Sequence, residues 1–278
     1  MKKWIPCNVV RPLEIRALYT AFDITFDDAF SFAGESHNFY ESICVLDGLV
    51  GIAADSDLYT VPAGNLVLHK PMEFHRIWSE GQTKPRIIII SFDATITPEP
   101  VGCVFTLSKD EQTAFESIYR EIAQSCEISA RRVIGIHPDS HARLQTAVNS
   151  LENLLLRVLA GSLIREAPQT ESSECAIKYR DIMKYLNENL NARLSIDDVA
   201  RACGMSGSGA KQIFRRYTGQ GIMSYFRDLK TKEAIKMLSE GMSVKETALS
   251  LGFSDQNYFS TFFKKMTGKS PRAYMNRE

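Results

Sequence analysis

Four polar side chains near the end of the chain share one face of a predicted helix. Gln256, Asn257, Ser260 and Lys264 recur at intervals of one, three and four positions, which brings them together on an α-helix. Amide side chains bond the edges of bases, and lysine and serine side chains bond backbone phosphates. The opposite face is apolar and consists of Phe259, Phe262, Phe263 and Met266. The pattern therefore predicts a helix that packs on a core and presents polar groups to nucleic acid.

A second polar face of this kind follows Ser206. The members that we expect to contact DNA are Ser208, Lys211, Gln212, Arg215 and Arg216. We assign Arg216 to a phosphate, since an arginine bonds phosphate oxygens without reading sequence. In the later helix we expect Lys265 to bind phosphate and Ser254 both to contact DNA and to cap the helix. The alternative is that Asp255 or Gln256 only caps this helix end.

A capping box and a glycine turn position the later polar face. Ser243 is followed three positions later by Glu246, so each side chain is expected to bond a free amide of the first helical turn. Gly252 is placed to adopt the left-handed conformation that ends a helix. The same arrangement occurs earlier in the chain, at Ser195 and Gly204. The chain therefore predicts two helix-turn-helix units.

One helix over residues 221–238 is predicted to join the two units. At 1.5 Å per residue it is about 25 Å long, which is of the same order as the roughly 34 Å between successive major grooves.

The later unit also resembles a known family. The AraC/XylS family of bacterial transcription regulators has a signature similar to GFSDQNYFS at residues 252–260, FK at 263–264 and TGKSP at 267–271. This resemblance implies a regulator that binds a double-stranded DNA operator, and with it we expect RNA polymerase as a partner and a role as an activator. The first unit departs from the family, with Gly209 in place of an aromatic residue and Gln212 in place of arginine. Glycine there costs about 1 kcal/mol relative to alanine.

In the N-terminal half, His37, Phe39 and Glu41 alternate and are predicted to point to one face of a strand. With residues 45–48, 62–64 and 70–76, this segment resembles the cupin-type sensing domain that precedes many AraC-like DNA-binding domains. Metal-binding cupins place ligands at the positions of His37, Glu41 and His75. Here Phe39 stands in place of a second histidine, and Met72 stands in place of a glycine.

We therefore expect a small polar effector, such as a sugar, and neither a metal nor another cofactor. The residues expected to bind it are His37, Phe39, Glu41, His75 and Trp78. No set of residues indicates catalysis, so we expect no enzymatic activity. Three alternatives stay open. His37 and Glu41 bond only within the barrel, or the cupin serves only for dimerisation, or it is a metal-dependent enzyme fused to a DNA-binding domain.

Short apolar runs with regular turns predict an α+β chain. Between residues 13 and 92 the runs are separated by turn residues, and Asp47-Gly48 in particular predicts a hairpin. We expect a cupin-like β-barrel over residues 1–107, of which 1–12 form an arm. A helical dimerisation segment over 108–165, a linker over 166–175 and an all-α AraC-type domain over 176–278 are expected to follow.

The expected dimer rests on one helix, over residues 141–161. Its apolar positions include Leu144, Leu151, Leu155 and Val158, which make a wider stripe than packing on a barrel requires. We therefore expect a homodimer through this helix, and packing in the core of its own subunit accounts for part of the stripe.

Charge is divided unevenly along the chain. The net charge is zero, but residues 171–278 contain 18 Lys and Arg against 12 Asp and Glu, and residues 1–170 contain 15 against 21. A basic C-terminal third is expected of a phosphate-binding module.

The six cysteines lack a C-x-x-C pair, which excludes an ordinary zinc knuckle. No apolar run approaches the roughly 20 residues that span a bilayer, so we expect a cytoplasmic protein without a membrane partner.

Overall fold

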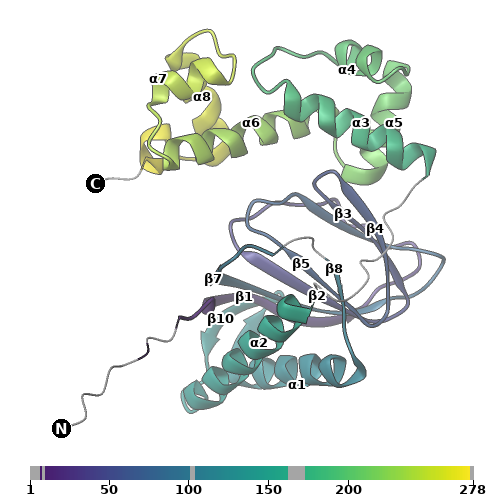
Figure 1. The fold of residues 1–278 in the computed structure, drawn as a ribbon, viewed down its shortest axis with the longest axis vertical. Coiled ribbons are helices and arrows are strands. Elements are labelled where there is room, and N and C mark those ends of the chain that lie inside the picture. The colour runs from purple at the N-terminus through teal and green to yellow at the C-terminus, as the bar shows by residue number, and fades with distance from the viewer. Residues whose placement is uncertain (1–6, 8–9, 101–103, 162–172, 276–278) are drawn as a thin grey trace. The chain divides into compact units, whose positions relative to one another are not determined.

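The chain divides into two units, whose main boundary lies between Thr170 and Glu171. A computed structural model describes residues 7, 10–100, 104–161 and 173–275. The first unit is built mainly of β-strands and the second of α-helices (Figure 1). The predicted fold class, a β domain followed by a helical region, is therefore confirmed. Most of the expected arm over 1–12 and of the expected linker over 166–175 lies outside the described residues.

In the described part of the first unit, ten strands form two sheets. The larger has the order β8-β5-β2-β7-β1-β10-β9, and the smaller has the order β4-β3-β6. The strands are β1 Leu13–Thr25, β2 Tyr40–Asp47, β3 Leu49–Ala54, β4 Asp57–Pro62, β5 Asn65–His69, β6 His75–Ser79, β7 Arg86–Ile96, β8 Val104–Thr106, β9 Cys126–Ser129 and β10 Arg132–Ile136. The central strands β2, β5 and β7 are largely buried, because both faces of the larger sheet are covered.

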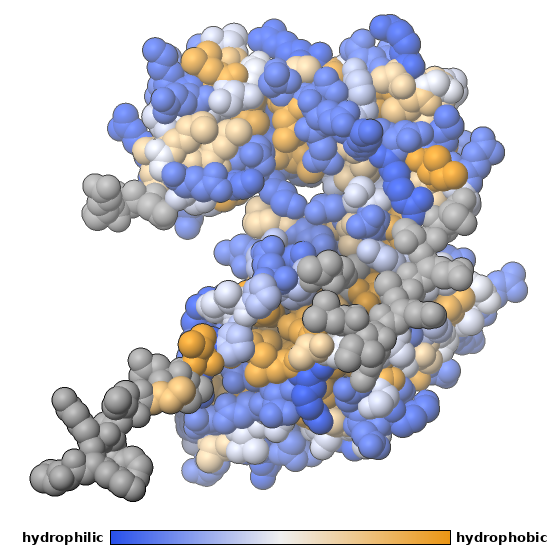
Figure 2. All heavy atoms as spheres, in the orientation of Figure 1, coloured by the Kyte–Doolittle hydropathy of each residue, from blue (hydrophilic) through white to orange (hydrophobic). Residues whose placement is uncertain are grey.

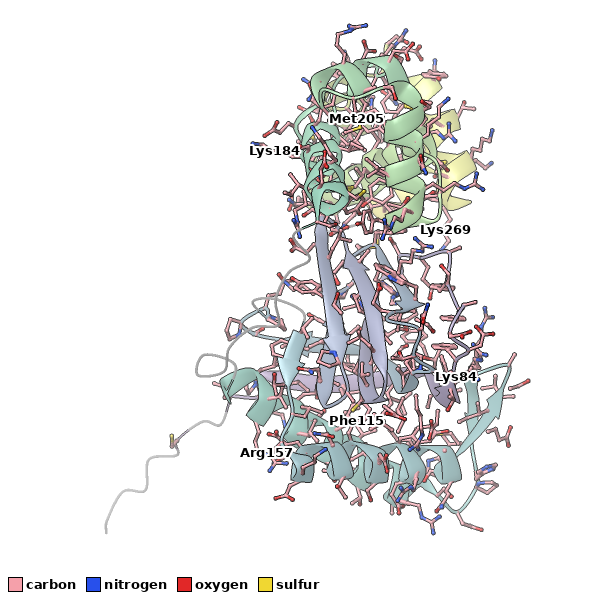
Figure 3. The ribbon with its side chains drawn as sticks, turned by 90° about the vertical axis from the view of Figure 1, so that its right-hand side faces the viewer. Lys84, Phe115, Arg157, Lys184, Met205 and Lys269 are labelled. Carbon is pink, nitrogen blue, oxygen red and sulfur yellow. The ribbon has the colours of Figure 1, made fainter. Side chains whose placement is uncertain are left out.

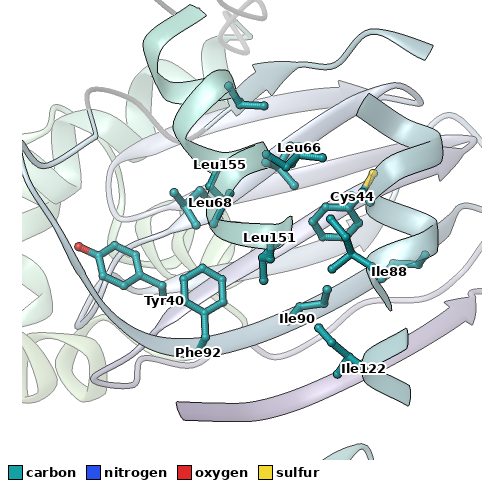
Figure 4. Packing of buried hydrophobic residues seen from close by; sticks show 14 of the residues in the cluster. Tyr40, Cys44, Leu66, Leu68, Ile88, Ile90, Phe92, Ile122, Leu151 and Leu155 are labelled. Atoms are coloured by element: carbon teal, nitrogen blue, oxygen red, sulfur yellow. The ribbon is translucent and has the colours of Figure 1, made fainter. Parts of the chain in front are cut away.

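Two helices cover one face of the larger sheet. They are α1 Lys109–Ser125 and α2 His141–Gly161. Cys44, Ile88 and Ile90 from the sheet form one buried cluster with Phe115 of α1 and Leu151 of α2 (Figures 3 and 4). These strand residues alternate with others that point to the opposite face, where the site described below is found.

The apolar stripe of α2 belongs to this core. Leu151 and Leu155 are fully buried and Val158 is 1% exposed within a single chain, and Leu144 packs against the same cluster. The expectation that Leu151, Leu155 and Val158 form a dimer interface is therefore wrong, because their apolar surface is already removed from water by the sheet and α1. Leu144 is only partly buried.

The segment between the two helices is a β-hairpin. β9 and β10 pair with each other, and β10 extends the larger sheet beside β1. The prediction of a helical segment over 108–165 is therefore wrong from Cys126 to Ile136. The turn of the hairpin consists of Ala130 and Arg131, both with positive φ, and neither residue is a usual signal for such a turn.

The turn at Asp47-Gly48 also differs from its prediction. Gly48 has a φ of +74° as the turn requires, but β2 pairs with β5 and β7, whereas β3 pairs with β6. The turn therefore carries the chain from one sheet to the other instead of closing a hairpin.

The second unit contains two copies of one helical motif. Its helices are α3 Glu174–Glu188, α4 Ile196–Ala202, α5 Gly207–Thr218, α6 Ile222–Ser239, α7 Val244–Ser250 and α8 Gln256–Thr267, followed by the 3-10 helix η1 Pro271–Tyr274. The pair α4 and α5 is repeated as the pair α7 and α8, with a left-handed glycine in each turn. α6 joins the two pairs, which lie at its opposite ends (Figure 1).

Direct contacts fix the second helical pair to the loop that precedes the first pair. Lys230 of α6 donates hydrogen bonds to the carbonyl oxygens of Ala192, in the loop between α3 and α4, and of Leu251, in the turn after α7. The backbone of Gly252 lies against Asn191, so closely that a Cβ atom on Gly252 would come within 1.8 Å of the Asn191 carbonyl oxygen. Both contacts hold the two motifs in one arrangement.

Candidate functional site

The later polar face lies on α8 as predicted. Phe259 and Phe263 are fully buried in a cluster with Ala248 of α7 and Leu251 of the turn. The opposite face is open to solvent, and its members are Gln256, Asn257, Lys264 and Lys265, with Ser260 half-buried. The hydroxyl group of Ser260 donates to the carbonyl oxygen of Gln256 within the helix.

Asp255, and not Ser254, caps α8. Its carboxylate accepts hydrogen bonds from the backbone amides of Asn257 and Tyr258, at 2.9 and 2.8 Å. A carboxylate is also favoured at this end by the helix dipole. The expectation that Ser254 caps the helix is therefore wrong; its side chain is exposed and lies 3.4 Å from Asp255.

The first polar face lies on α5. Ser206 caps this helix by accepting a hydrogen bond from the amide of Gly209, so Gly209 lies in the first turn. The predicted contact residues Ser208, Lys211, Gln212, Arg215 and Arg216 are all exposed. Phe214 and Tyr217 are buried on the other side. The guanidinium of Arg216 lies 5.4 Å from the Tyr217 ring centroid.

A groove beside α8 is lined by Arg272, a cation that was not predicted as a contact residue. Gln256, Ser260, Lys264 and Lys265 line it together with Arg272 of η1. The sequence Ser270-Pro271-Arg272 after α8 could have indicated a further short helix that carries Arg272, since proline favours the first turn of a new helix. Figure 2 shows that hydrophilic side chains dominate the visible surface of the helical unit, and Lys269 extends from it in Figure 3.

In the first unit, strand register brings a row of polar residues across the larger sheet. Glu41 on β2 lies directly opposite His69 on β5 and Ser91 on β7, and Ser91 lies opposite Thr20 on β1. The hydroxyl of Ser91 donates to Oε2 of Glu41 at 2.9 Å, and its oxygen is 2.5 Å from that of Thr20. Glu41 is 8% exposed, so it is a buried carboxylate held by neighbours on the same face.

Two histidines approach this carboxylate from other elements. Nε2 of His75, on β6 of the smaller sheet, lies 3.4 Å from Oε1 of Glu41. Nε2 of His37, in the segment before β2, lies 3.9 Å from Oε2. His75 also stacks on His69, with ring centroids 4.4 Å apart. The cluster therefore joins the two sheets of the first unit across its interior.

The charges in this cluster follow from burial and hydrogen bonding. Burial opposes ionisation of Glu41, but the hydrogen bond and charge of His75, with smaller contributions from His69 and Ser91, lower the pKa of Glu41 to about 2. Burial, followed by the neighbouring His75, lowers the pKa of His37. Burial also lowers the pKa of His69 well below its usual value. Hydrogen bonds and charge thus favour the ionised carboxylate of Glu41, while burial favours the neutral imidazoles of His37 and His69.

The structure brings together three of the predicted effector residues, His37, Glu41 and His75, and places the other two differently. Phe39 stacks on the His37 ring, with centroids 3.7 Å apart, and on Tyr19. β2 begins only at Tyr40, so His37 and Phe39 are not strand residues. The prediction that they share a strand face with Glu41 is therefore wrong.

Trp78 lies apart from the cluster. It follows His75 by three positions in the same strand, which places it on the opposite face of β6. There its ring covers Gly51, Arg76 lies over it, and its indole nitrogen donates to Glu80. The structure therefore does not place Trp78 beside His75, as the prediction of a shared ligand site requires.

Comparison with known proteins identifies relatives of the helical unit. Residues 191–277 match the protein family described as a helix-turn-helix domain. The arabinose operon regulatory protein of Salmonella typhimurium is 34% identical over 132 residues, which are 46% of this chain and 44% of that protein. The HTH-type transcriptional activator RhaR of Yersinia pestis is 34% identical over 98 residues, 34% of this chain and 33% of that protein. The chain thus spans less than half the length of each of these two relatives.

Solved structures that resemble this chain include one from Chromobacterium violaceum and one from Vibrio cholerae. One is the transcriptional regulator of Chromobacterium violaceum described as an AraC-type DNA-binding domain-containing protein, at 25% identity, covering 35% of this chain and 88% of that chain with a TM-score of 0.33. The other is ToxT from Vibrio cholerae, at 13% identity, covering 95% of this chain and 97% of that chain with a TM-score of 0.35. Within the described residues, none of the helices combines the length and the apolar character needed to traverse a bilayer.

Proposed function

We propose, from the premise that residues 191–277 form an AraC/XylS-type helix-turn-helix domain, that this protein is a transcription regulator that binds DNA. Its helical unit reads an operator through α5 and α8, and its β unit senses a small effector. The protein acts as an activator with RNA polymerase as its partner, in the cytoplasm, and without catalysing a reaction. The duplicated exposed face on α5 and α8 is the observation that carries this proposal.

The spacing of the two polar faces supports simultaneous contact of both faces with one DNA molecule. α6 has 18 residues, which corresponds to a length of about 27 Å. Successive major grooves on one side of DNA are about 34 Å apart. Since Lys230 and Gly252 hold the two motifs together, we infer that α5 and α8 enter adjacent major grooves as one rigid reader.

The proposed sensing site is the cluster of His37, Glu41 and His75. A small polar ligand is suited to it because hydrogen-bonding groups that are largely buried converge there.

Homodimerisation is part of the proposal, with the dimer contact placed before residue 171. The exposed side of α2, which includes Asn153, Leu156 and Arg157, is the available surface, since the apolar stripe of that helix is occupied.

Selection of bound sequences from a random DNA pool with the full-length protein tests this function. We expect enriched DNA to contain two conserved blocks whose centres are about 10 base pairs apart, the repeat of one helical turn. A variant with Gln256→Ala should lose preference in one block, and a variant with Gln212→Ala should lose it in the other. Absence of enrichment, or a single short block unaffected by both changes, would contradict the proposal.

A further inference from the structure

A second groove in the helical unit is formed by the loop 192–194, α6, the turn 252–255 and α8, and we call it the α6–α8 groove. Its volume is about 560 Å³, within the roughly 300–1,000 Å³ of ligand sites in proteins. Among the described residues it shares none of its lining with the groove that includes Arg272. On α8 it is lined by Tyr258 and Phe262, whereas residues two positions away from them line the other groove. Two positions are about 200° apart on a helix, so the two grooves lie on different flanks of α8.

The lining of the α6–α8 groove is positively charged. It includes Arg193 and Arg227, which are exposed, and Lys230, which is 9% exposed. Asp255 is the one acid in the described lining, and its carboxylate already accepts hydrogen bonds from two backbone amides at the start of α8. Three cations and one carboxylate leave a net charge of +2. The groove is therefore suited to an anion.

Lys230 is the buried member of this positive lining. Its Nζ atom donates to two carbonyl oxygens and lies 5.0 Å from the ring centroid of Phe226 and 5.4 Å from that of Phe253. Burial, followed by the charge of Arg193, lowers the pKa of Lys230, and no described carboxylate contributes to this shift. Buried charges in proteins are usually paired with an opposite charge, so a bound anion is a partner that fits this ammonium group.

Aromatic rings form another part of the lining. The ring centroid of Phe253 lies 5.8 Å from that of Tyr258 and 5.0 Å from that of Phe262. Phe253 and Phe262 are half-buried, and Tyr258 is 58% exposed. Aromatic side chains of this kind stack on the bases of nucleotides, because every base has a π-face. An anion without a ring makes no use of this wall, so the groove is suited to a ligand with both an anionic group and a flat ring.

We propose that the α6–α8 groove binds a nucleoside monophosphate, with its base on the aromatic wall and its phosphate beside Arg193 and Arg227. A phosphate monoester carries a charge of about −1.5 to −2 at pH 7, which matches the net charge of the lining better than the single charge of a carboxylate. Arginine also bonds phosphate oxygens through two parallel hydrogen bonds. This site is separate from the sensing cluster of the β unit and does not rest on the proposed DNA binding.

DNA carries the same two chemical groups, but its bases are less available. In a duplex each base is paired and stacked, and taking it out of the stack costs energy. A free nucleotide presents its base and its phosphate together. The aromatic wall therefore favours the free nucleotide as the occupant of the groove.

The test titrates full-length protein, free of DNA, with AMP in a calorimeter. Adenosine, which lacks the phosphate, and inorganic phosphate, which lacks the base, are the matched probes. We expect one equivalent of AMP per chain, bound at least about 10-fold more tightly than either probe. Arg193→Gln should weaken AMP binding by about 10-fold through the loss of a charge-assisted hydrogen bond. Tyr258→Ala should weaken it by about 10-fold through the loss of a stacked ring.

Each of these two variants has a control in the same unit. Arg201→Gln removes an exposed guanidinium on α4 that does not line the groove. Leu249→Ala removes an apolar side chain that is 58% exposed, as Tyr258 is, and that also lies outside the groove lining. Both controls should leave AMP affinity unchanged. Circular dichroism of every variant establishes that it is folded, which we expect because all four positions are exposed.

The proposal is overturned if the unmodified protein does not bind AMP, or if it binds AMP and adenosine equally well. AMP binding that is unaffected by Arg193→Gln and Tyr258→Ala would place the nucleotide elsewhere in the chain. Random-sequence duplex DNA is titrated with the same variants. If Arg193→Gln weakens binding of duplex DNA while the unmodified protein does not bind AMP, the cations of the groove serve the DNA backbone and the nucleotide site is refuted.

Discussion

At the scale of single residues, the DNA contacts proposed for α8 are of two kinds, side chains suited to read bases and side chains suited to bind phosphates. Gln256 and Asn257 are exposed at the start of the helix, where amide groups are suited to bond adenine in pairs of hydrogen bonds. Lys264 and Lys265 lie in its last turn and line the groove that includes Arg272. Each class makes a different prediction for mutants.

Replacing Asn257 by alanine should reduce affinity for the selected operator by about 1–3 kcal/mol and leave affinity for random DNA nearly unchanged. Fluorescence anisotropy with both DNAs measures the two affinities. Lys264→Ala is the control, and it should weaken binding to both DNAs alike because phosphates are present in every sequence. An equal loss on both DNAs for Asn257→Ala would show that this residue does not read bases.

Salt dependence gives a second measure of the phosphate contacts. On the two helices proposed to read DNA, α5 and α8, five cations are exposed: Lys211, Arg215, Arg216, Lys264 and Lys265. Five phosphate contacts correspond to a fall in affinity of about 500-fold between 50 and 200 mM salt. Lys265→Ala should lower the slope of log affinity against log salt by about 1, and an unchanged slope would remove Lys265 from the interface.

At the scale of elements, the first helix of each motif, α4 or α7, starts with a capping box. In α7, the hydroxyl group and the backbone amide of Ser243 both donate to the Glu246 carboxylate, and Ser243 accepts from the Glu246 amide. The side-chain hydrogen bond, followed by the backbone one, lowers the pKa of Glu246 below its ordinary value of 4.5.

Ser243→Ala should destabilise the helical unit by about 1 kcal/mol near neutral pH. The folded-state pKa of Glu246 is below its unfolded value, so the stabilisation is present above the unfolded pKa and is lost as the pH falls through the folded one. The cost of the mutation should therefore shrink below about pH 4. Thermal unfolding at pH 7 and pH 3 measures it. Ser150→Ala on α2, away from any cap, serves as the control, and a cost that does not depend on pH would contradict the role of Glu246.

The turn glycines of the two motifs provide a matched pair. Gly204 has a φ of +62° and an open space where a Cβ would lie, whereas Gly252 has a φ of +71° and the Asn191 carbonyl oxygen there. Gly204→Ala should cost about 1–2 kcal/mol, the strain of a left-handed residue with a side chain. Gly252→Ala adds a backbone collision and should cost more by at least about 2 kcal/mol. Urea unfolding compares them, and equal costs would show that the Asn191 contact yields easily.

At the scale of the whole molecule, opposite net charges divide the two units, with the basic excess after residue 170. That division matches a protein that binds DNA with one unit and something else with the other. The dimer proposed above belongs to this scale, because it would bring two helical units to one operator.

Analytical ultracentrifugation tests the dimer with the full-length protein. We expect a dimer that Leu156→Glu and Arg157→Glu together convert to a monomer, since these positions are exposed on α2 while its apolar stripe is buried. Asn187→Glu, at an exposed position on α3, is the control and should not change the sedimentation coefficient. A dimer that resists the paired change would place the interface elsewhere.

Much of the helical unit was evident from the sequence alone, for a local reason. Caps, left-handed glycines and apolar periodicity act within a few residues, so Ser243, Gly252 and the stripe of Phe259 and Phe263 were sufficient to define α7, the turn and α8. The one error in these caps, Ser254 for Asp255, arose because both residue types are good caps and lie side by side.

The β unit was decided by contacts between distant segments. Strand register places Ser91 beside Glu41, and a change of sheet at Gly48 brings His75 of the smaller sheet to the same carboxylate. Neither follows from sequence spacing, because register depends on the packing of the whole sheet. For the same reason α2 was misassigned: its apolar stripe was evident, but only the tertiary structure shows that the sheet and α1 bury it. The sequence determined which residues have side chains able to bind DNA or a ligand, and the fold determined which of them lie close together.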